Sequence, residues 1–171
     1  MIVAEKKALQ PTVAARYFLA STLVNACAAV AVAAPVLVAR LALPLKLTEW
    51  PGTWMFVAYG VFVGFGVLGS LAWSAIYYLS GVLLGVKHLR RNFVVAQLLL
   101  HNIAAYGIGF LMGYAVGYVG GTARLEGFGL SVITALISWA VIPIGVLVFI
   151  GLVSTVLGVF TVLDSWLRPR G

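Results

Sequence analysis

His101 is the residue of this chain whose type and place most directly suggest chemistry. It lies with Asn102 near the middle of an unbroken apolar stretch, residues 92–121, which is longer than the roughly 20 residues that cross a bilayer. Polar side chains at that depth are costly and mark a candidate functional site. The imidazole could ligate haem iron or contact a quinone headgroup near Asn102 and Tyr106. His101, Asn102 and Tyr106 are therefore the candidate cofactor-binding residues, with haem b or a quinone as ligand.

The competing interpretation of His101 is structural. The chain has 2 histidines, and His88 precedes His101 by 13 positions, which is about 20 Å along a helix. The two cannot share one iron, so a second haem ligand would come from a neighbouring chain. A neutral His101 hydrogen-bonded to Asn25, Ser74 or a carbonyl of another helix is the simpler alternative, because buried polar groups are usually satisfied within the fold.

The sequence offers few residues for ion transport, thiol chemistry or hydrolysis. Carriers and pumps use carboxylates within their spans, and the 4 acidic residues here all fall in tails or gaps: Glu5, Glu49, Glu126 and Asp164. A small channel or carrier is therefore the third choice of function. The single cysteine, Cys27, excludes a thiol pair, and no motif of a metalloprotease, P-loop or serine hydrolase occurs. We expect no metal site and no catalysis by this chain alone.

Composition identifies the class of protein. Of the 171 residues, 63% are hydrophobic and 9% are charged, whereas soluble domains carry about 25% charged residues. The chain is expected to be one transmembrane domain, residues 1–171. Its net charge of +7 lies in the short gaps between apolar runs, which indicates lipid headgroups and membrane topology rather than nucleic acid as the partner.

Four apolar segments are expected to form the transmembrane helices: 17–43, 53–86, 93–121 and 128–163. They are continuously apolar, whereas strands of a membrane barrel alternate. The predicted fold class is therefore all-α, a four-helix transmembrane bundle.

The second and fourth segments are long for a bilayer. As helices of 34 and 36 residues they would reach about 51–54 Å, against a hydrocarbon core of about 30 Å. Strong tilt, protrusion from the bilayer, or a break near Pro143 would accommodate them. A break that splits the fourth segment would produce five spans instead of four.

Cationic residues predict the orientation, because they favour the cytoplasmic side. Of the 11 lysines and arginines, 8 lie in the two tails and the second gap, and 3 lie in or close to the first and third gaps. The first group is Lys6, Lys7, Arg16, Lys87, Arg90, Arg91, Arg168 and Arg170; the second is Arg40, Lys46 and Arg124. We expect a multi-pass protein of the cell membrane with both termini in the cytoplasm, which disfavours five spans.

Glycines at intervals of four predict where helices pack closely, because small residues let backbones approach in lipid. The predicted helix-packing residues are Gly60, Gly64, Gly81 and Gly85 in the second segment, and Gly109, Gly113, Gly117 and Gly121 in the third. Their grooves could serve the bundle itself or a partner subunit, and internal packing is the favoured use.

Two stretches carry a resemblance to a known family. The run Gln97–Ile103, introduced by Arg90 and Arg91, looks like the third-helix region of the catalytic subunit of haem–copper oxidases and nitric oxide reductases. The run Gly64–Leu79, with its paired tyrosines, looks like the preceding helix. In that family the preceding helix carries a haem-ligating histidine, but the corresponding position here, near Val61, has none. The resemblance implies a short, non-catalytic relative.

The leading functional hypothesis is an accessory or structural subunit of a larger membrane complex, with respiratory electron transfer as its setting. In that role the glycine grooves pack on helices of other membrane subunits or of a second copy, and His101 and Asn102 supply interhelical hydrogen bonds. The alternative is a haem- or quinone-binding membrane protein that uses His101.

Overall fold

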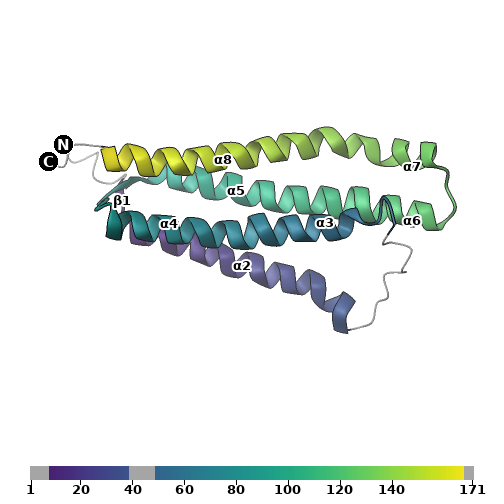
Figure 1. Ribbon diagram of the computed structural model, residues 1–171, viewed down its shortest axis with the longest axis horizontal. Helices are drawn as coiled ribbons and strands as arrows, with labels where there is room; N and C mark the ends of the chain where they lie inside the picture. Colours follow the sequence, from purple (N-terminus) through teal and green to yellow (C-terminus); the bar gives the residue numbers. More distant parts are fainter. Residues whose placement is uncertain (1–7, 39–48, 168–171) are drawn as a thin grey trace.

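The computed structural model describes residues 8–38 and 49–167. Over these residues the regular secondary structure is helical except for one pair of short strands, and short turns connect the elements (Figure 1). Four helices are long and apolar enough to cross a membrane: Pro11–Ala34, Trp54–Leu83, Arg91–Leu125 and Leu130–Leu167. These helices confirm the all-α class and the presence of four long apolar helices.

The first span is one helix, α2 (Pro11–Val38). It begins six residues before the predicted segment, because Pro11 suits the first position of a helix and the amides of Val13 and Ala14 bond to the carbonyl of Gln10. The predicted end of this segment, residues 39–43, lies outside the described residues.

The other three spans are each built from several helical elements. The second comprises α3 (Trp54–Val61), η2 (Phe62–Gly69) and α4 (Ser70–Leu83). The third comprises α5 (Arg91–Phe110), η3 (Leu111–Tyr118) and α6 (Val119–Leu125). The fourth comprises α7 (Leu130–Ile137), η4 (Ser138–Ala140) and α8 (Val141–Leu167).

Two of these elements are π-helices of 8 residues each, η2 and η3. They were not predicted from the sequence. π-Helical turns are rare, and they occur preferentially at functional sites. Both contain glycines: η2 lies near the middle of the second span and η3 in the second half of the third, next to the polar and aromatic residues described below.

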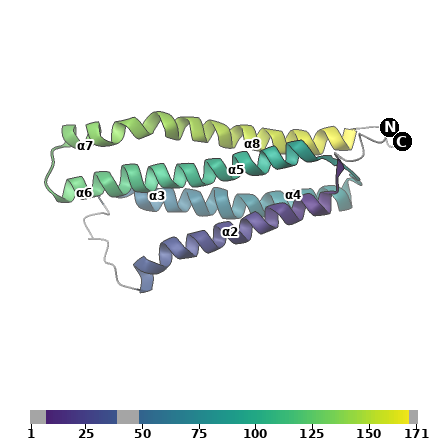
Figure 2. The ribbon, with the colours of Figure 1, turned by 180° about the vertical axis from the view of Figure 1, so that it is seen from behind.

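The predicted break near Pro143 takes the form of the short 3₁₀ turn η4. Proline has no amide hydrogen and its ring clashes with the carbonyl four residues earlier, which here belongs to Trp139 within η4. The chain does not reverse at this turn: α7 and α8 follow one another along the same side of the bundle (Figures 1 and 2). The fourth segment therefore forms a single candidate span, Leu130–Leu167.

The helices pack in a defined order. Helix α2 lies against α4 and η2, α5 lies against α8, and α3 lies against η3. Toward Val38, α2 diverges from α3 (Figures 1 and 2). At the opposite end a buried cluster that includes Phe18, Trp73, Tyr77 and Val94 fills the space between the helices.

The strands close this tightly packed end. Strand β1 (Ala8–Leu9) pairs antiparallel with β2 (Leu89–Arg90). Arg90 also reaches α8, where its Nε lies 3.2 Å from a carboxylate oxygen of Asp164. The first and last described elements thus meet at the turn between the second and third spans.

Replacing Arg90 with alanine is expected to lower the free energy of unfolding by less than about 1 kcal/mol. The Arg90 side chain is 49% exposed, and exposed ion pairs contribute little because water and salt screen them. Unfolding in mixed detergent micelles, followed by circular dichroism, measures the change. A loss well above this limit would show that Arg90 has a larger part in joining α8 to the strands.

Candidate functional site

His101 is fully buried among aromatic rings and a glycine. Its ring centroid lies 4.3 Å from that of Phe65 and 6.2 Å from that of Phe18. On another side it faces Gly69, where an added Cβ would lie 3.1 Å from Cε1. Neither ring nitrogen forms a hydrogen bond within the described part of the chain, although the Phe65 carbonyl lies close to the ring.

The surroundings of His101 do not fit a haem. An axial ligand needs open space beyond one ring nitrogen for the iron and its macrocycle. A Cβ at Gly69 would lie 3.5 Å from Nε2, so the backbone of the second span stands close to that nitrogen. Phe65 covers a face of the ring. No haem can reach this imidazole while η2 and α5 are packed as they are here.

Asn102, the neighbour of His101, belongs to a polar cluster that connects three helices. Asn25 Nδ2 of α2 donates to the Gly66 carbonyl at 2.8 Å and to Asn102 Oδ1 at 3.2 Å. Ser21 Oγ donates to the same Asn102 oxygen at 3.0 Å. Ser70 lies 3.4 Å from Asn25 Nδ2 through its Oγ. We call Ser21, Asn25, Ser70 and Asn102 the polar layer.

Of the three partners expected for a structural His101, the structure excludes two, Asn25 and Ser74. The third, a carbonyl of another helix, corresponds to the Phe65 carbonyl of η2 that lies close to the ring. His101 does not bond to Asn25, because the amide nitrogen of Asn25 donates to the Gly66 carbonyl and to Asn102 Oδ1 instead. It does not bond to Ser74 either, whose Oγ donates to the carbonyl of Ala15 at 2.8 Å. His101 and Asn102 were both expected to supply interhelical hydrogen bonds. Asn102 accepts such bonds from Ser21 and Asn25. Among the described residues, His101 packs on the ring of Phe65.

A second buried polar group lies one helical turn from His101. Tyr77 donates its hydroxyl hydrogen to Gln97 Oε1, and Ser154 Oγ of α8 donates to the Gln97 carbonyl at 2.9 Å. Gly158 leaves the space that the Gln97 amide and Trp73 occupy. Sequence reasoning did not select Gln97 or Tyr77. The sequence feature that could have indicated this pair is Gln97 itself, a polar residue four positions before His101 in the same apolar stretch.

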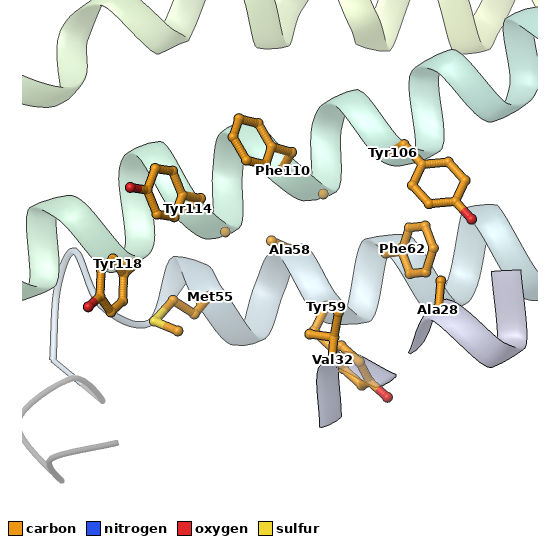
Figure 3. A pocket seen from close by; sticks show the side chains of 12 residues that line it. Ala28, Val32, Met55, Ala58, Tyr59, Phe62, Tyr106, Phe110, Tyr114 and Tyr118 are labelled. Atoms are coloured by element: carbon orange, nitrogen blue, oxygen red, sulfur yellow. The ribbon is translucent and has the colours of Figure 1, made fainter. Parts of the chain in front are cut away.

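Tyr106, the third candidate residue, lies in a different place. Its ring packs on Phe62 with centroids 5.0 Å apart, and both line a cavity of about 410 Å³. Figure 3 shows that the lining side chains come from α2, from α3 with η2, and from α5 with η3. We call this cavity the aromatic pocket. Its lining is Ala28, Val32, Met55, Ala58, Tyr59, Phe62, Tyr106, Gly109, Phe110, Gly113, Tyr114 and Tyr118.

Stacked rings follow the third span beside the pocket. The centroids of Phe110 and Tyr114 are 5.4 Å apart, and those of Tyr114 and Tyr118 are 5.7 Å apart. The interplanar angles are 16° and 13°. This series begins at mid-span and ends where η3 ends, so one wall of the pocket is aromatic along its length.

The glycines of the third span face the second span. An added Cβ would lie 3.5 Å from Phe62 Cβ at Gly109, 3.3 Å from Ala58 Cβ at Gly113, and 2.6 Å from the Met55 amide nitrogen at Gly117. Gly121, at the next interval of four, is buried in α6. These positions bring α3 against α5 and η3.

The glycines of the second span lie in three different environments. At Gly81 an added Cβ would lie 3.2 Å from Pro11 Cβ, so this residue packs on α2. Gly85 follows the end of α4 and has a φ of 65°, which is a turn conformation that favours glycine. At Gly60 and Gly64 no atom of the described residues lies within 4 Å of an added Cβ.

The polar side chains brought together here can hold helices by hydrogen bonds, and the pocket can hold an apolar group. Within residues 8–38 and 49–167, no three histidine, cysteine or acidic side chains are close enough to hold a metal ion. No protein-family model, curated protein or solved structure matches this chain.

Proposed function

We propose that this chain is a non-catalytic subunit of a larger complex in the cell membrane. The observation that carries this proposal is the open face of the second span at Gly60 and Gly64. Small residues four positions apart let another backbone approach closely, and membrane helices associate through such faces. In the third span, Gly113 and Gly117 are covered by α3 and Gly109 by η2 of the same chain. No described residue covers Gly60 and Gly64, so this pair can receive a helix of another subunit.

The arrangement of the polar residues supports a structural role. Asn25, Asn102 and Ser21 bond to one another and to the backbone of η2. Interhelical hydrogen bonds of this kind stabilise helix association in lipid. These side chains hold α2, the second span and α5 in register, and a register held in this way keeps the Gly60–Gly64 face in one orientation for a partner.

We further propose that the β1–β2 end of the bundle faces the cytoplasm, together with both termini. Cations favour that side. Lys87, Arg90 and Arg91 lie in or beside β2, and Arg16 lies in the first turns of α2, whereas Arg124 is in α6 at the other end. The resemblance of Gln97–Ile103 and Gly64–Leu79 to haem–copper oxidases makes a respiratory complex the setting that we propose.

The test is co-purification from the membranes of the source organism. A tagged wild-type chain, extracted in a mild detergent, is expected to carry a fixed set of membrane proteins that quantitative mass spectrometry identifies. Replacing both Gly60 and Gly64 with leucine is expected to reduce their recovery at least tenfold, since the two side chains would hold a partner helix away.

The matched control is Gly145→Leu in α8, where an added Cβ also meets no atom within 4 Å. This variant should recover the same proteins as the wild type. The proposal fails if the wild-type chain purifies without other membrane proteins. It also fails if the double glycine variant recovers its partners as well as the control does.

A further inference from the structure

We propose that the aromatic pocket binds one hydrocarbon chain of a membrane glycerolipid. This site is separate from the Gly60–Gly64 face, and its occupant is a lipid rather than a protein. The lipid would enter from the leaflet at the α3 and η3 end of the bundle, which is the end away from the strands.

The direction of the pocket favours a lipid chain. Tyr106 lies near the middle of the third span, and Tyr118 lies at the end of η3. Trp54 begins α3 at the same end as Tyr118, and tryptophan and tyrosine favour the interface between membrane and water. The pocket therefore runs from the interface toward the bilayer centre, along the direction of the lipid chains. A lipid can place its tail in the pocket while its headgroup stays at the surface.

The width of the pocket separates a lipid chain from a helix. From Tyr106 to Tyr118 the third span advances roughly 18 Å at the α-helical rise. The whole empty space of the pocket, about 960 Å³, spread over that length has a mean cross-section of roughly 53 Å². A helix with a diameter of about 10–12 Å has a cross-section of roughly 80–110 Å². The space admits a chain of methylene groups and excludes a helix of a second copy or of another subunit.

The walls of the pocket explain why it stays open. Ala58, Gly109 and Gly113 carry little or no side chain where α3 faces the third span, so they leave room beside the rings. On the opposite side α2 diverges from α3 (Figures 1 and 2). Ala28 and Val32 of α2 then form a low edge over which a chain can enter sideways from the bilayer (Figure 3). The ring faces on the other wall offer dispersion contacts to each methylene group that enters.

The test compares two variants of α2 that differ only in whether the new side chain reaches the pocket. Val32 lines the pocket and is 64% exposed, whereas Val30 is 65% exposed and does not line it. Val32→Trp would place an indole over the opening, and Val30→Trp would place the same indole toward the surrounding lipid. Both positions are exposed, so neither change disturbs the core of the bundle.

The measurement is native mass spectrometry of chains reconstituted in phosphatidylcholine vesicles, extracted and washed with detergent. The wild type and Val30→Trp are expected to retain one phosphatidylcholine per chain, and Val32→Trp at least tenfold less. Tyr114→Ala, which removes a ring of the wall, should retain several-fold less lipid than Phe149→Ala, an exposed position of α8 outside the pocket.

Several results would overturn the proposal. One is a wild-type chain that retains no lipid, and another is a Val32→Trp chain that retains as much lipid as Val30→Trp. Loss of lipid in both tryptophan variants would place the bound lipid elsewhere. A prenyl quinone or a second copy of the chain found in place of the lipid would assign the pocket to a different occupant.

Discussion

Gly117→Ala is expected to lower the free energy of unfolding by about 2 kcal/mol, within the range of overpacking substitutions. The new Cβ would lie 2.6 Å from the amide nitrogen of Met55 and 3.1 Å from its Cα. Both are backbone atoms, so no change of rotamer relieves the contact. The start of α3 must move away from η3 to make room. Reversible unfolding in mixed detergent micelles, followed by far-ultraviolet circular dichroism, measures the loss.

Gly109→Ala is the matched control for this prediction. Gly109 lies on the third span like Gly117 and also faces the second span, but its added Cβ would be 3.5 Å from Phe62 Cβ of η2, an ordinary van der Waals contact. Alanine is also favoured over glycine inside a helix by roughly 0.5–1 kcal/mol. Gly109→Ala should therefore leave stability unchanged or raise it slightly. Equal losses in the two variants would show that α3 is not packed on η3 at Met55.

The close packing at Gly117 could be predicted from the spacing of the glycines, because small residues at intervals of four form one face of a helix. Which helix covers that face could not. Gly60 and Gly64 have the same spacing as Gly113 and Gly117, yet one pair is open and the other is covered. The difference depends on how the second span is rotated in the bundle, and rotation is a property of all four helices together.

The spans themselves followed directly from the sequence. A continuous apolar run longer than about 20 residues can satisfy its backbone in lipid only as a helix, and each predicted run forms one. The π-helices η2 and η3 could not be predicted in the same way, because α- and π-helices bury the same kinds of residue. Two features that involve residues of η2 were therefore not predicted either: the accessible carbonyl of Gly66 and the position of Phe65 against His101.

The three candidate cofactor-binding residues do not form one site, because the sequence does not determine which helix each of them faces. His101, Asn102 and Tyr106 lie within six positions of one another in the sequence, and the structure sends them to three environments: an aromatic enclosure, the polar layer and the aromatic pocket. Side chains on one helix point in different directions. Membrane depth selected these residues correctly as unusual, but depth does not say which neighbouring helix each one faces.

Asn25→Leu is expected to lower the free energy of unfolding by about 2 kcal/mol. Asn25 is fully buried, and its amide donates to the Gly66 carbonyl at 2.8 Å and to Asn102 Oδ1 at 3.2 Å. Interhelical hydrogen bonds in membrane proteins contribute about 0.6 kcal/mol on average and up to about 1.7 kcal/mol. Leucine removes both bonds. It also leaves the Gly66 carbonyl of η2 without this donor in an apolar interior, which adds a cost of desolvation.

Thr22→Val is the control for Asn25→Leu. It removes a buried hydrogen bond within α2, whereas Asn25→Leu removes bonds between helices. Thr22 is also buried, but its hydroxyl donates to the Phe18 carbonyl of its own helix at 2.9 Å. That carbonyl keeps its place in the helix when the hydroxyl is removed, so the expected change is below about 0.5 kcal/mol. Both variants are measured by the same unfolding experiment. Equal changes would mean that Asn25 does not join α2 to the second and third spans, whereas a loss confined to Asn25→Leu assigns that role to the polar layer.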